Sequence, residues 1–324
     1  MARSIRKRKI GAMEATYVLE PPFPRELLID ISSYCNHACN FCANTRMTNK
    51  KIMEPDKVFK FLKEGFECGA RDIGLYATGE PFAAKGLPDY VAEAKKLGYE
   101  YIYITTNGAG ATPERAKKVL DNGLDSIKYS IHAGTRETYQ KVHGRDDFLK
   151  VIKNLKWASN YRQESGLDFG IYVTMVQTHD TVNEVELLKE LVEPYIDEWD
   201  PHLLTNSCGT MAENNEIGEI DENNIRGRGH SDICFQPFKS FTVTAEGYMS
   251  ACVLDYYKGL IVADLNKVTM KEAWHNEVYK NFRQKHLDMN PKGTICYNCR
   301  YNADEPYEGL LPEYSDKPTK PPRR

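Results

Sequence analysis

Three cysteines stand close together near the start of the chain. They are Cys35, Cys39 and Cys42 in the stretch CNHACNFC, with the spacing C-x3-C-x2-C. Thiolates hold iron–sulfur clusters, and a 4Fe-4S cube bound by three of them keeps one iron open to another molecule. Structural zinc is the alternative, but it takes four protein ligands, and no fourth cysteine or histidine at a suitable spacing follows Cys42. The motif therefore predicts a cluster with an open iron.

Four more cysteines form a second set in the last third of the chain. Cys234 precedes the turn residue Gly247, Cys252 follows it, and Cys296 and Cys299 form a distant C-x2-C pair in CYNC. Four thiolates can close a tetrahedral zinc site or saturate a second 4Fe-4S cluster. Spacing alone leaves both interpretations open.

The whole-chain composition limits the setting. The 324 residues include nine cysteines and carry a net charge of −3. An odd cysteine count without an export signal argues against a disulfide framework and favours metal or redox chemistry. No overall basic field indicates nucleic acid, and no run of about 18 apolar residues indicates a membrane span. We expect a cytoplasmic protein that binds neither nucleic acid nor membrane, with Cys68 as a small core residue.

The elements that must position these cysteines follow from the pattern between Leu27 and Thr205. Six strand-like segments alternate with helical ones, and each strand is short and bounded by turn residues. Six such units predict a parallel sheet curled into most of a barrel, with its chemistry at the carboxyl ends of the strands. The three-cysteine loop leaves the first strand at that end. The expected strands are 27–32, 72–77, 101–105, 125–131, 169–176 and 199–205, and the expected helices are 55–68, 88–97, 113–122, 148–164 and 182–195.

The pattern changes after the sixth strand. Residues 206–230 are polar and aperiodic, which is typical of a linker or an active-site loop. The stretch FKSFTVTAEGYMSACV then predicts a hairpin, and TMKEAWHNEVYKNFRQKH predicts a helix. We divide the chain into an N-terminal extension (1–26), the barrel (27–205), the loop (206–233), a small α+β domain (234–305) and a C-terminal tail (306–324).

The motifs together resemble the radical S-adenosylmethionine (radical SAM) superfamily. The evidence is the cysteine loop, YATGEP at the end of the second strand, TTNG at the end of the third, and YSIHAGTRETYQKVHG from the fourth. The resemblance implies an α/β fold with a partial (β/α)6 TIM-like barrel, and SAM bound to the open iron. The last four cysteines resemble the twitch domain, the short form of the SPASM extension, which implies a second, auxiliary 4Fe-4S cluster in place of zinc. A flavodoxin- or ferredoxin-type electron donor is also implied.

The resemblance also implies which residues contact SAM. Gly79 and Glu80 match positions that hold its amino group, Ser130 matches a ribose contact, and Phe41 matches an aromatic residue beside the adenine. His143 falls where an arginine often meets the SAM carboxylate, so nearby Arg145 is an alternative for that contact.

Three residues are candidates for catalysis. Alternation along the fourth strand places Lys128 and His132 on the same side as Ser130, a polar set suited to a hydroxylated substrate, although both could also solvate the ends of the barrel. Continued alternation through PHLLTNSC would turn Cys208 toward the cavity with His202 and Asn206, where its thiol could return a hydrogen atom to a substrate radical.

The relatives that the chain resembles most suggest a hydroxylated small molecule. We expect hydrogen abstraction from a sugar, aminocyclitol or nucleotide-linked sugar, giving dehydrogenation, epimerisation or a related rearrangement. Peptide modification is the alternative, although only 26 residues precede the first strand, too few for a peptide-binding module. Molybdopterin-precursor cyclases end in Gly-Gly and leave an auxiliary iron open, unlike this chain. An iron–sulfur electron carrier without a substrate is the alternative from another class.

Overall fold

The computed structural model describes residues 15–218 and 233–316. The start and end of the chain (1–14, 317–324) and residues 219–232 of the predicted loop lie outside this range. One nine-stranded sheet runs through the described part, in the order β6-β5-β4-β3-β2-β1-β7-β8-β9. Its first six strands all pair in parallel, as predicted for a partial barrel. The strands are β1 Glu26–Ile29, β2 Asp72–Gly74, β3 Tyr101–Thr106, β4 Ser126–Ser130, β5 Gly170–Gln177, β6 Glu198–Leu203, β7 Ser240–Val243, β8 Tyr248–Ser250 and β9 Ile261–Asp264.

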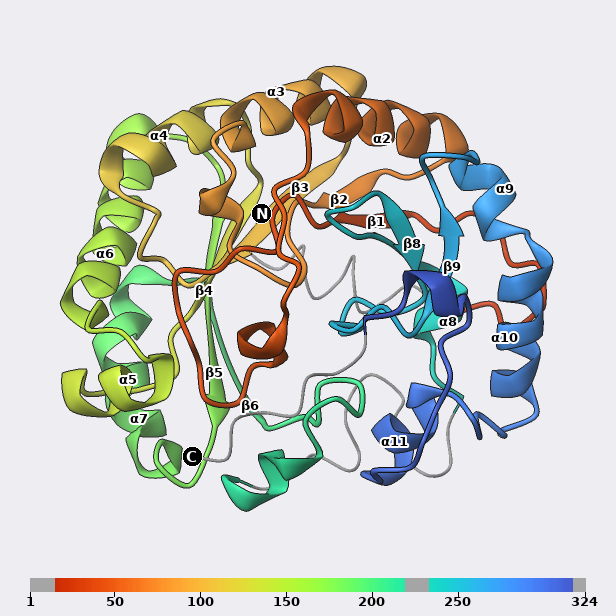
Figure 1. Cartoon of the computed structure of the whole chain (residues 1–324). Helices are drawn as coiled ribbons and strands as arrows, with labels where there is room; N and C mark the ends of the chain where they lie inside the picture. Colours follow the sequence, from red (N-terminus) through yellow and green to blue (C-terminus); the bar gives the residue numbers. More distant parts are fainter. Residues whose placement is uncertain (1–14, 219–232, 317–324) are drawn as a thin grey trace.

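Helices cover the convex face of the curved sheet (Figure 1). Five of the expected helices are present, and α2 has the predicted bounds. The helix expected over 182–195 is shorter, because Pro194 lacks the N–H that an α-helix needs and a 3₁₀ turn follows Val192. The barrel helices are α2 Pro55–Cys68, α3 Leu87–Leu97, α4 Pro113–Asp121, α5 Arg136–His143, α6 Phe148–Ser165 and α7 Val185–Val192.

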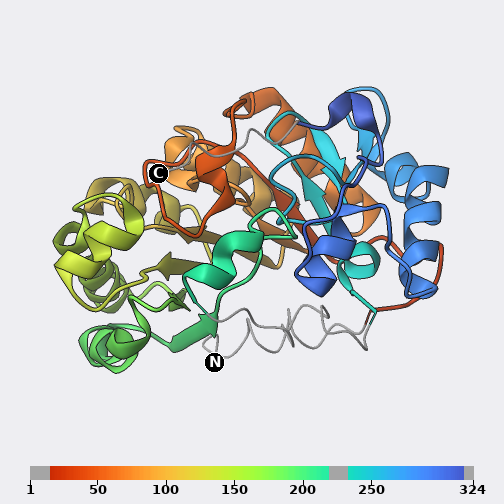
Figure 2. The same ribbon diagram turned by 60° about the horizontal axis from the view of Figure 1, so that its bottom comes forward.

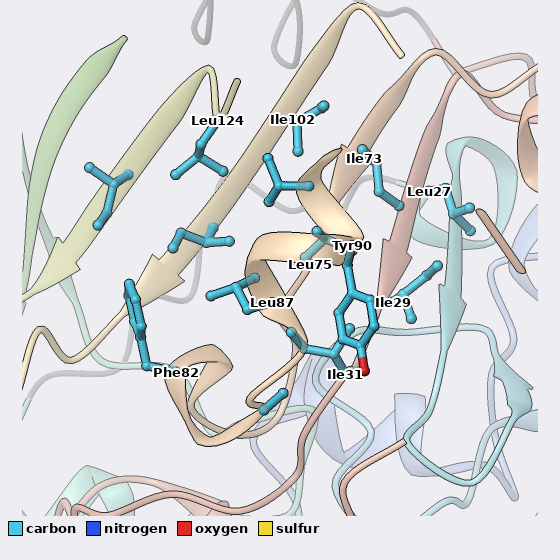
Figure 3. Packing of buried hydrophobic residues seen from close by; sticks show 14 of the residues in the cluster. Leu27, Ile29, Ile31, Ile73, Leu75, Phe82, Leu87, Tyr90, Ile102 and Leu124 are labelled. Carbon is cyan, nitrogen blue, oxygen red and sulfur yellow. The ribbon is translucent and has the colours of Figure 1, made fainter. Parts of the chain in front are cut away.

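The main core lies between the strands and these helices. Leu27, Ile73 and Ile102 follow one another across the first three strands and are fully buried. They pack against helix residues such as Leu87 and Tyr90 (Figure 3). Because alternate strand residues point to opposite faces, the intervening residues line the concave face of the sheet. That face carries the predicted site.

The C-terminal elements continue the same sheet. β7 pairs in parallel with β1, placing Phe241 beside Leu27, and β7 and β8 form the predicted antiparallel hairpin. Gly247 in its turn has φ 90°, a conformation that glycine adopts without strain. A short helix α8 Gln236–Lys239 leads into β7. These elements form the small α+β part that follows the barrel.

The helix expected around Trp274 is divided. α9 Met270–Trp274 begins with a capping box between Thr269 and Glu272, and the Asn276 side chain caps α10 Glu277–Leu287 by accepting the Tyr279 N–H at 2.8 Å. A second cap so close to the first interrupts the helix, because Asn favours non-helical backbone. The pattern missed β9 and α11 Ile295–Tyr301, which carries the CYNC pair. Figure 2 shows α10 at the opposite end of the molecule from α5 and α7.

Within residues 15–218 and 233–316, the helices are too short or too polar to cross a bilayer.

Candidate cluster and cofactor sites

The three-cysteine loop follows β1 and lies within the curve of the sheet (Figure 1). The Ala38 and Asn40 N–H groups donate to the carbonyls of His143 and Val142, at 2.9 and 3.0 Å, which fixes the loop to the end of α5. Burial raises the pKa of Cys39 well above its usual value, and the thiols of Cys42 and Cys35 raise it further. Iron bound to the three sulfur atoms would favour their deprotonated form, because a metal takes cysteine as the thiolate. The three cysteines therefore fit the cluster that the sequence predicts.

The loop after β2 packs directly on the cysteine loop. A Cβ on Gly79 would lie 2.3 Å from the Ser32 carbonyl oxygen and 2.6 Å from that of Tyr34. The neighbouring Glu80 N–H donates to the Tyr34 carbonyl at 2.7 Å. Only glycine permits this approach, so the YATGEP motif holds the cysteine loop against the sheet.

Glu80 is buried, with 4% of its surface exposed. Its carboxylate accepts hydrogen bonds from the Thr106 hydroxyl at 2.6 Å, the Asn107 N–H at 2.8 Å and the Phe82 N–H at 3.0 Å. Burial raises the pKa of Glu80, and these three donors oppose the rise. A carboxylate offers about four acceptor positions, so about one remains for an ammonium group.

The TTNG motif meets the first cysteine. The Asn107 side chain donates to Asn36 Oδ1 at 2.8 Å and approaches Cys35 Sγ at 3.7 Å. The sequence indicates this motif only as the end of a strand. Its asparagine now connects the first cysteine of the loop to the segment that anchors Glu80.

His143 lies against the cysteine loop and is fully buried. Its Nε2 accepts the His132 N–H at 3.1 Å, which assigns the ring hydrogen to Nδ1. That Nδ1–H faces Cys39 Sγ at 3.5 Å and His37 Nδ1 at 3.2 Å, while His37 Nε2 contacts Asp147 at 3.2 Å. Burial lowers the pKa of His143 well below its usual value, so the ring is neutral. Both nitrogens are thus engaged within the protein.

The ligand atoms of His37, Cys39 and His143 lie within 4.8 Å of one another, as in a metal site. However, the tautomer of His143 places a hydrogen on the nitrogen that faces the other two, and a protonated nitrogen cannot bind a metal. The sequence also predicts Cys39 as a cluster ligand beside Cys35 and Cys42. We therefore interpret the two histidines as hydrogen-bonding partners of the loop.

Phe41 and His132 lie in edge-to-face contact, with ring centroids 5.0 Å apart. Burial lowers the pKa of His132 to about 3, and its Nδ1 accepts the Val176 N–H at 3.0 Å. His132 is therefore neutral and follows the end of β4, where it packs between Phe41 and His143. Its catalytic role remains a prediction.

Polar side chains line the concave face of β4 to β6. The strand register places Ser130 beside Thr174 and Thr174 beside Asp200. Lys128 pairs with Asp200 at 2.5 Å, and the Thr174 hydroxyl donates to the Asp200 carbonyl at 2.9 Å. Lys128 and Ser130 are half-buried, whereas Ile127 and Tyr129, which alternate with them, are buried in the core. The alternation expected for Lys128 and Ser130 is present.

The four C-terminal cysteines line one largely apolar cavity, and Cys208 is the fifth thiol there. This differs from the placement expected from extended alternation. β6 ends at Leu203, and Ser207, Cys208 and Gly209 have φ values of 46°, 61° and 79°. Such left-handed backbone ends the alternation, so Cys208 does not share a side with His202. Its role as a hydrogen-atom donor remains a prediction.

The segment from Cys252 to Tyr256 links the two cysteine sites. Its hydroxyl lies 3.9 Å from Cys42 Sγ, and the Leu254 N–H donates to Cys252 Sγ at 3.4 Å. Tyr256 and Tyr257 also pack with Ala43 and Met211 in a small apolar cluster. Nothing in the sequence pattern indicated this bridge, because it depends on a contact between distant segments.

Comparisons with known proteins agree with this arrangement. Residues 29–192 match the family model of the radical SAM superfamily, and residues 234–300 match an iron–sulfur cluster-binding domain, SPASM. A probable GTP 3′,8-cyclase from Metallosphaera sedula is 23% identical over 76% of this chain and 77% of its own length.

Two solved structures share the fold. BtrN, in complex with AdoMet and 2-DOIA, has a TM-score of 0.57 and 18% identity over 87% of this chain and 96% of its own. SuiB from Streptococcus suis, bound to the precursor peptide SuiA, has a TM-score of 0.60 and 13% identity over 80% of this chain and 66% of its own.

Proposed function

This chain belongs to the radical SAM superfamily of enzymes, and on that premise we propose that it abstracts a hydrogen atom from a hydroxylated small molecule. Its cofactors are SAM and two 4Fe-4S clusters. When bound, the SAM-binding cluster and SAM supply a 5′-deoxyadenosyl radical, which removes the hydrogen atom. We assign Cys35, Cys39 and Cys42 to this cluster. Cys234, Cys252, Cys296 and Cys299 are assigned to the auxiliary cluster.

Several residues would bind and orient SAM. Glu80 would accept a hydrogen bond from the SAM ammonium at its remaining acceptor position, and the Gly79 carbonyl would accept another. Ser130 would contact the ribose, and Phe41 the adenine. His143 has both ring nitrogens engaged, which favours Arg145 for the SAM carboxylate; its Nε donates to the Asn36 carbonyl at 3.2 Å, beside the cysteine loop.

The polar concave face is the observation that carries the substrate class. Ser130, Thr174 and the Lys128–Asp200 pair offer hydroxyl, ammonium and carboxylate groups along three adjacent strands. Hydroxyl groups of a sugar, aminocyclitol or nucleotide-linked sugar can both donate to and accept from such a surface. Dehydrogenation or epimerisation is the expected outcome.

A purine nucleotide is the second candidate, because the probable GTP 3′,8-cyclase aligns over most of this chain. A peptide is the third, because the structure bound to a precursor peptide shares the fold.

The test begins with anaerobically reconstituted protein, dithionite and SAM. We expect about eight irons per chain, and about four after Cys35, Cys39 and Cys42 are all replaced by Ala, because each cube holds four. SAM should alter only the electron paramagnetic resonance signal that this triple variant loses. Stoichiometric zinc after purification without oxygen would contradict the auxiliary cluster.

Turnover separates the candidate substrates. Aminocyclitols, nucleotide-linked sugars, GTP and synthetic peptides are each incubated in deuterated water. 5′-Deoxyadenosine release that one polyol stimulates, with a product lacking two hydrogens or carrying one solvent deuterium, supports the proposal. If only GTP or only a peptide stimulated 5′-deoxyadenosine release, that substrate class would replace the proposed one. If no 5′-deoxyadenosine formed under any condition, the result would favour an electron carrier.

A further inference from the structure

Cys208 lies in a turn whose backbone conformation is unfavourable for residues other than glycine. The residue is 2% exposed, and it stands between Ser207 and Gly209 in three consecutive left-handed conformations. This conformation is unfavourable for a residue with a Cβ, so surrounding contacts must hold it.

Asn206 supplies those contacts. Its side-chain NH₂ donates to the Asn298 and Cys299 carbonyls, both at 3.1 Å, and its side-chain oxygen accepts the Gly209 N–H at 3.0 Å. A Cβ on Gly209 would lie 2.7 Å from the Cys299 backbone nitrogen. The turn is thus docked on α11, the helix that carries Cys296 and Cys299.

This docking brings the Cys208 thiol into the auxiliary site. Cys208 lines one cavity together with Cys252, Cys296 and Cys299. Cys234 lines the same cavity. Five thiols therefore surround a site that needs four, since a 4Fe-4S cube takes one thiolate for each iron.

We propose that Cys208 is a ligand-competent thiol of the auxiliary cluster and exchanges with Cys234 as its fourth ligand. The proposal rests on the assignment of the four C-terminal cysteines to that cluster. Because Cys208 lines the cavity with Cys252, Cys296 and Cys299, these four thiols form a complete ligand set without Cys234.

The exchange is balanced in atoms and electrons. In the exchange, the iron–sulfur bond to Cys234 would break as one to Cys208 forms, and the Cys208 proton would pass to the released Cys234 thiolate. Iron and sulfur keep their oxidation states, and the cluster keeps four thiolates. The exchange leaves the charge and the ligand type of the cluster unchanged. Because these properties set much of the reduction potential, the cluster should still be able to accept electrons.

The experiment counts irons in four variants of the full chain. Cys208→Ala and Cys234→Ala should each retain about eight irons, because four thiols remain in either case. Cys208→Ala/Cys234→Ala leaves three thiols and should retain about four irons, in the SAM-binding cluster only. The matched control Cys68→Ala/Cys234→Ala also removes two thiols, but Cys68 lies outside the cavity, so it should retain about eight.

A second readout verifies the fold and the ligand. The SAM-responsive resonance signal should persist in every variant, which shows that loss of iron is not loss of structure. The auxiliary signal should change its g-values between Cys208→Ala and Cys234→Ala. Loss of the auxiliary cluster from Cys234→Ala alone, with the SAM-responsive signal intact, would overturn the exchange.

A further variant separates this inference from the assignment on which it rests. Cys296→Ala/Cys299→Ala leaves three thiols at the cavity and should lose the auxiliary cluster. Retention of about eight irons there would contradict the auxiliary site itself. Loss there, together with loss in Cys234→Ala, would contradict only the role of Cys208.

Discussion

At the scale of single residues, some polar side chains of the site bind only other parts of the protein, whereas others still have hydrogen-bonding positions available to a ligand. His143 and His132 use their ring nitrogens on backbone and loop partners, although the sequence placed both among functional candidates. The Glu80 carboxylate accepts hydrogen bonds from three donors and so holds together the loops beside the cysteines. It can still accept a further hydrogen bond. The same side chain thus serves structure and, in our proposal, SAM binding.

Glu80→Gln should weaken SAM binding ten- to a hundredfold, because a charge-assisted hydrogen bond contributes roughly 1.5–3 kcal/mol. Equilibrium dialysis against SAM measures this, and iron content should not change. Asp255→Asn is the matched control: Asp255 is also a buried carboxylate with three donors, and it lies in the C-terminal part. SAM affinity equal in both variants would place Glu80 outside the SAM site.

At the scale of elements, the loops at the carboxyl ends of β1, β2 and β3 are built as one unit. Asn44 on the 3₁₀ helix Ala43–Arg46 donates to the carbonyls of both Ser33 and Thr78, each at 2.8 Å. Because Gly79 has no side chain, the backbone of the loop after β2 can approach the cysteine loop closely enough for these hydrogen bonds to form. Strand order thereby brings distant motifs together, since parallel strands end at one edge.

Gly79→Ala should displace the cysteine loop, because the nearest atoms to the new Cβ are backbone atoms that cannot rotate away. We expect iron to fall from about eight to about four, with the auxiliary signal retained. Gly69→Ala is the control, since a Cβ there meets nothing within 4 Å and its φ of 114° adds only local strain. Full iron content in Gly79→Ala would show that the loops are not coupled in this way.

At the scale of the whole molecule, the barrel and the C-terminal part share one sheet and one core. Trp274 is fully buried beside Phe241 and Phe23, and its indole N–H donates to the Pro21 carbonyl at 2.8 Å. Arg283 lies over its ring, 4.2 Å from the centroid. The seam between β1 and β7 therefore joins the N-terminal segment, the barrel and the C-terminal helices.

Trp274→Ala should cost about 3–5 kcal/mol of the free energy of unfolding, as expected for a large buried aromatic residue. Because the core is shared, we expect cluster absorbance and circular dichroism to fall together at a lower denaturant concentration. Leu149→Ala, at a position 64% exposed, should change little. Early loss of the C-terminal signal with the barrel intact would show that the two parts unfold separately.

Much of this molecule could be predicted from local sequence. The spacing of Cys35, Cys39 and Cys42, the six strands and the start of α2 at Pro55 follow from rules that act over a few residues: ligand number, strand alternation and helix caps. The motifs at strand ends could also be ordered around the barrel, because each parallel strand ends at the same edge.

The tertiary structure alone decided the contacts between distant segments. Local alternation placed Cys208 in the barrel cavity, but Asn206 forms hydrogen bonds to α11 and turns the thiol into the auxiliary site. The Tyr256 contact with Cys42 and the pairing of β7 with β1 likewise join residues about two hundred positions apart. The sequence determines which chemistry a side chain can perform. Which residues that side chain contacts depends on the arrangement of the whole sheet, and burial of apolar surface throughout the core stabilises that arrangement.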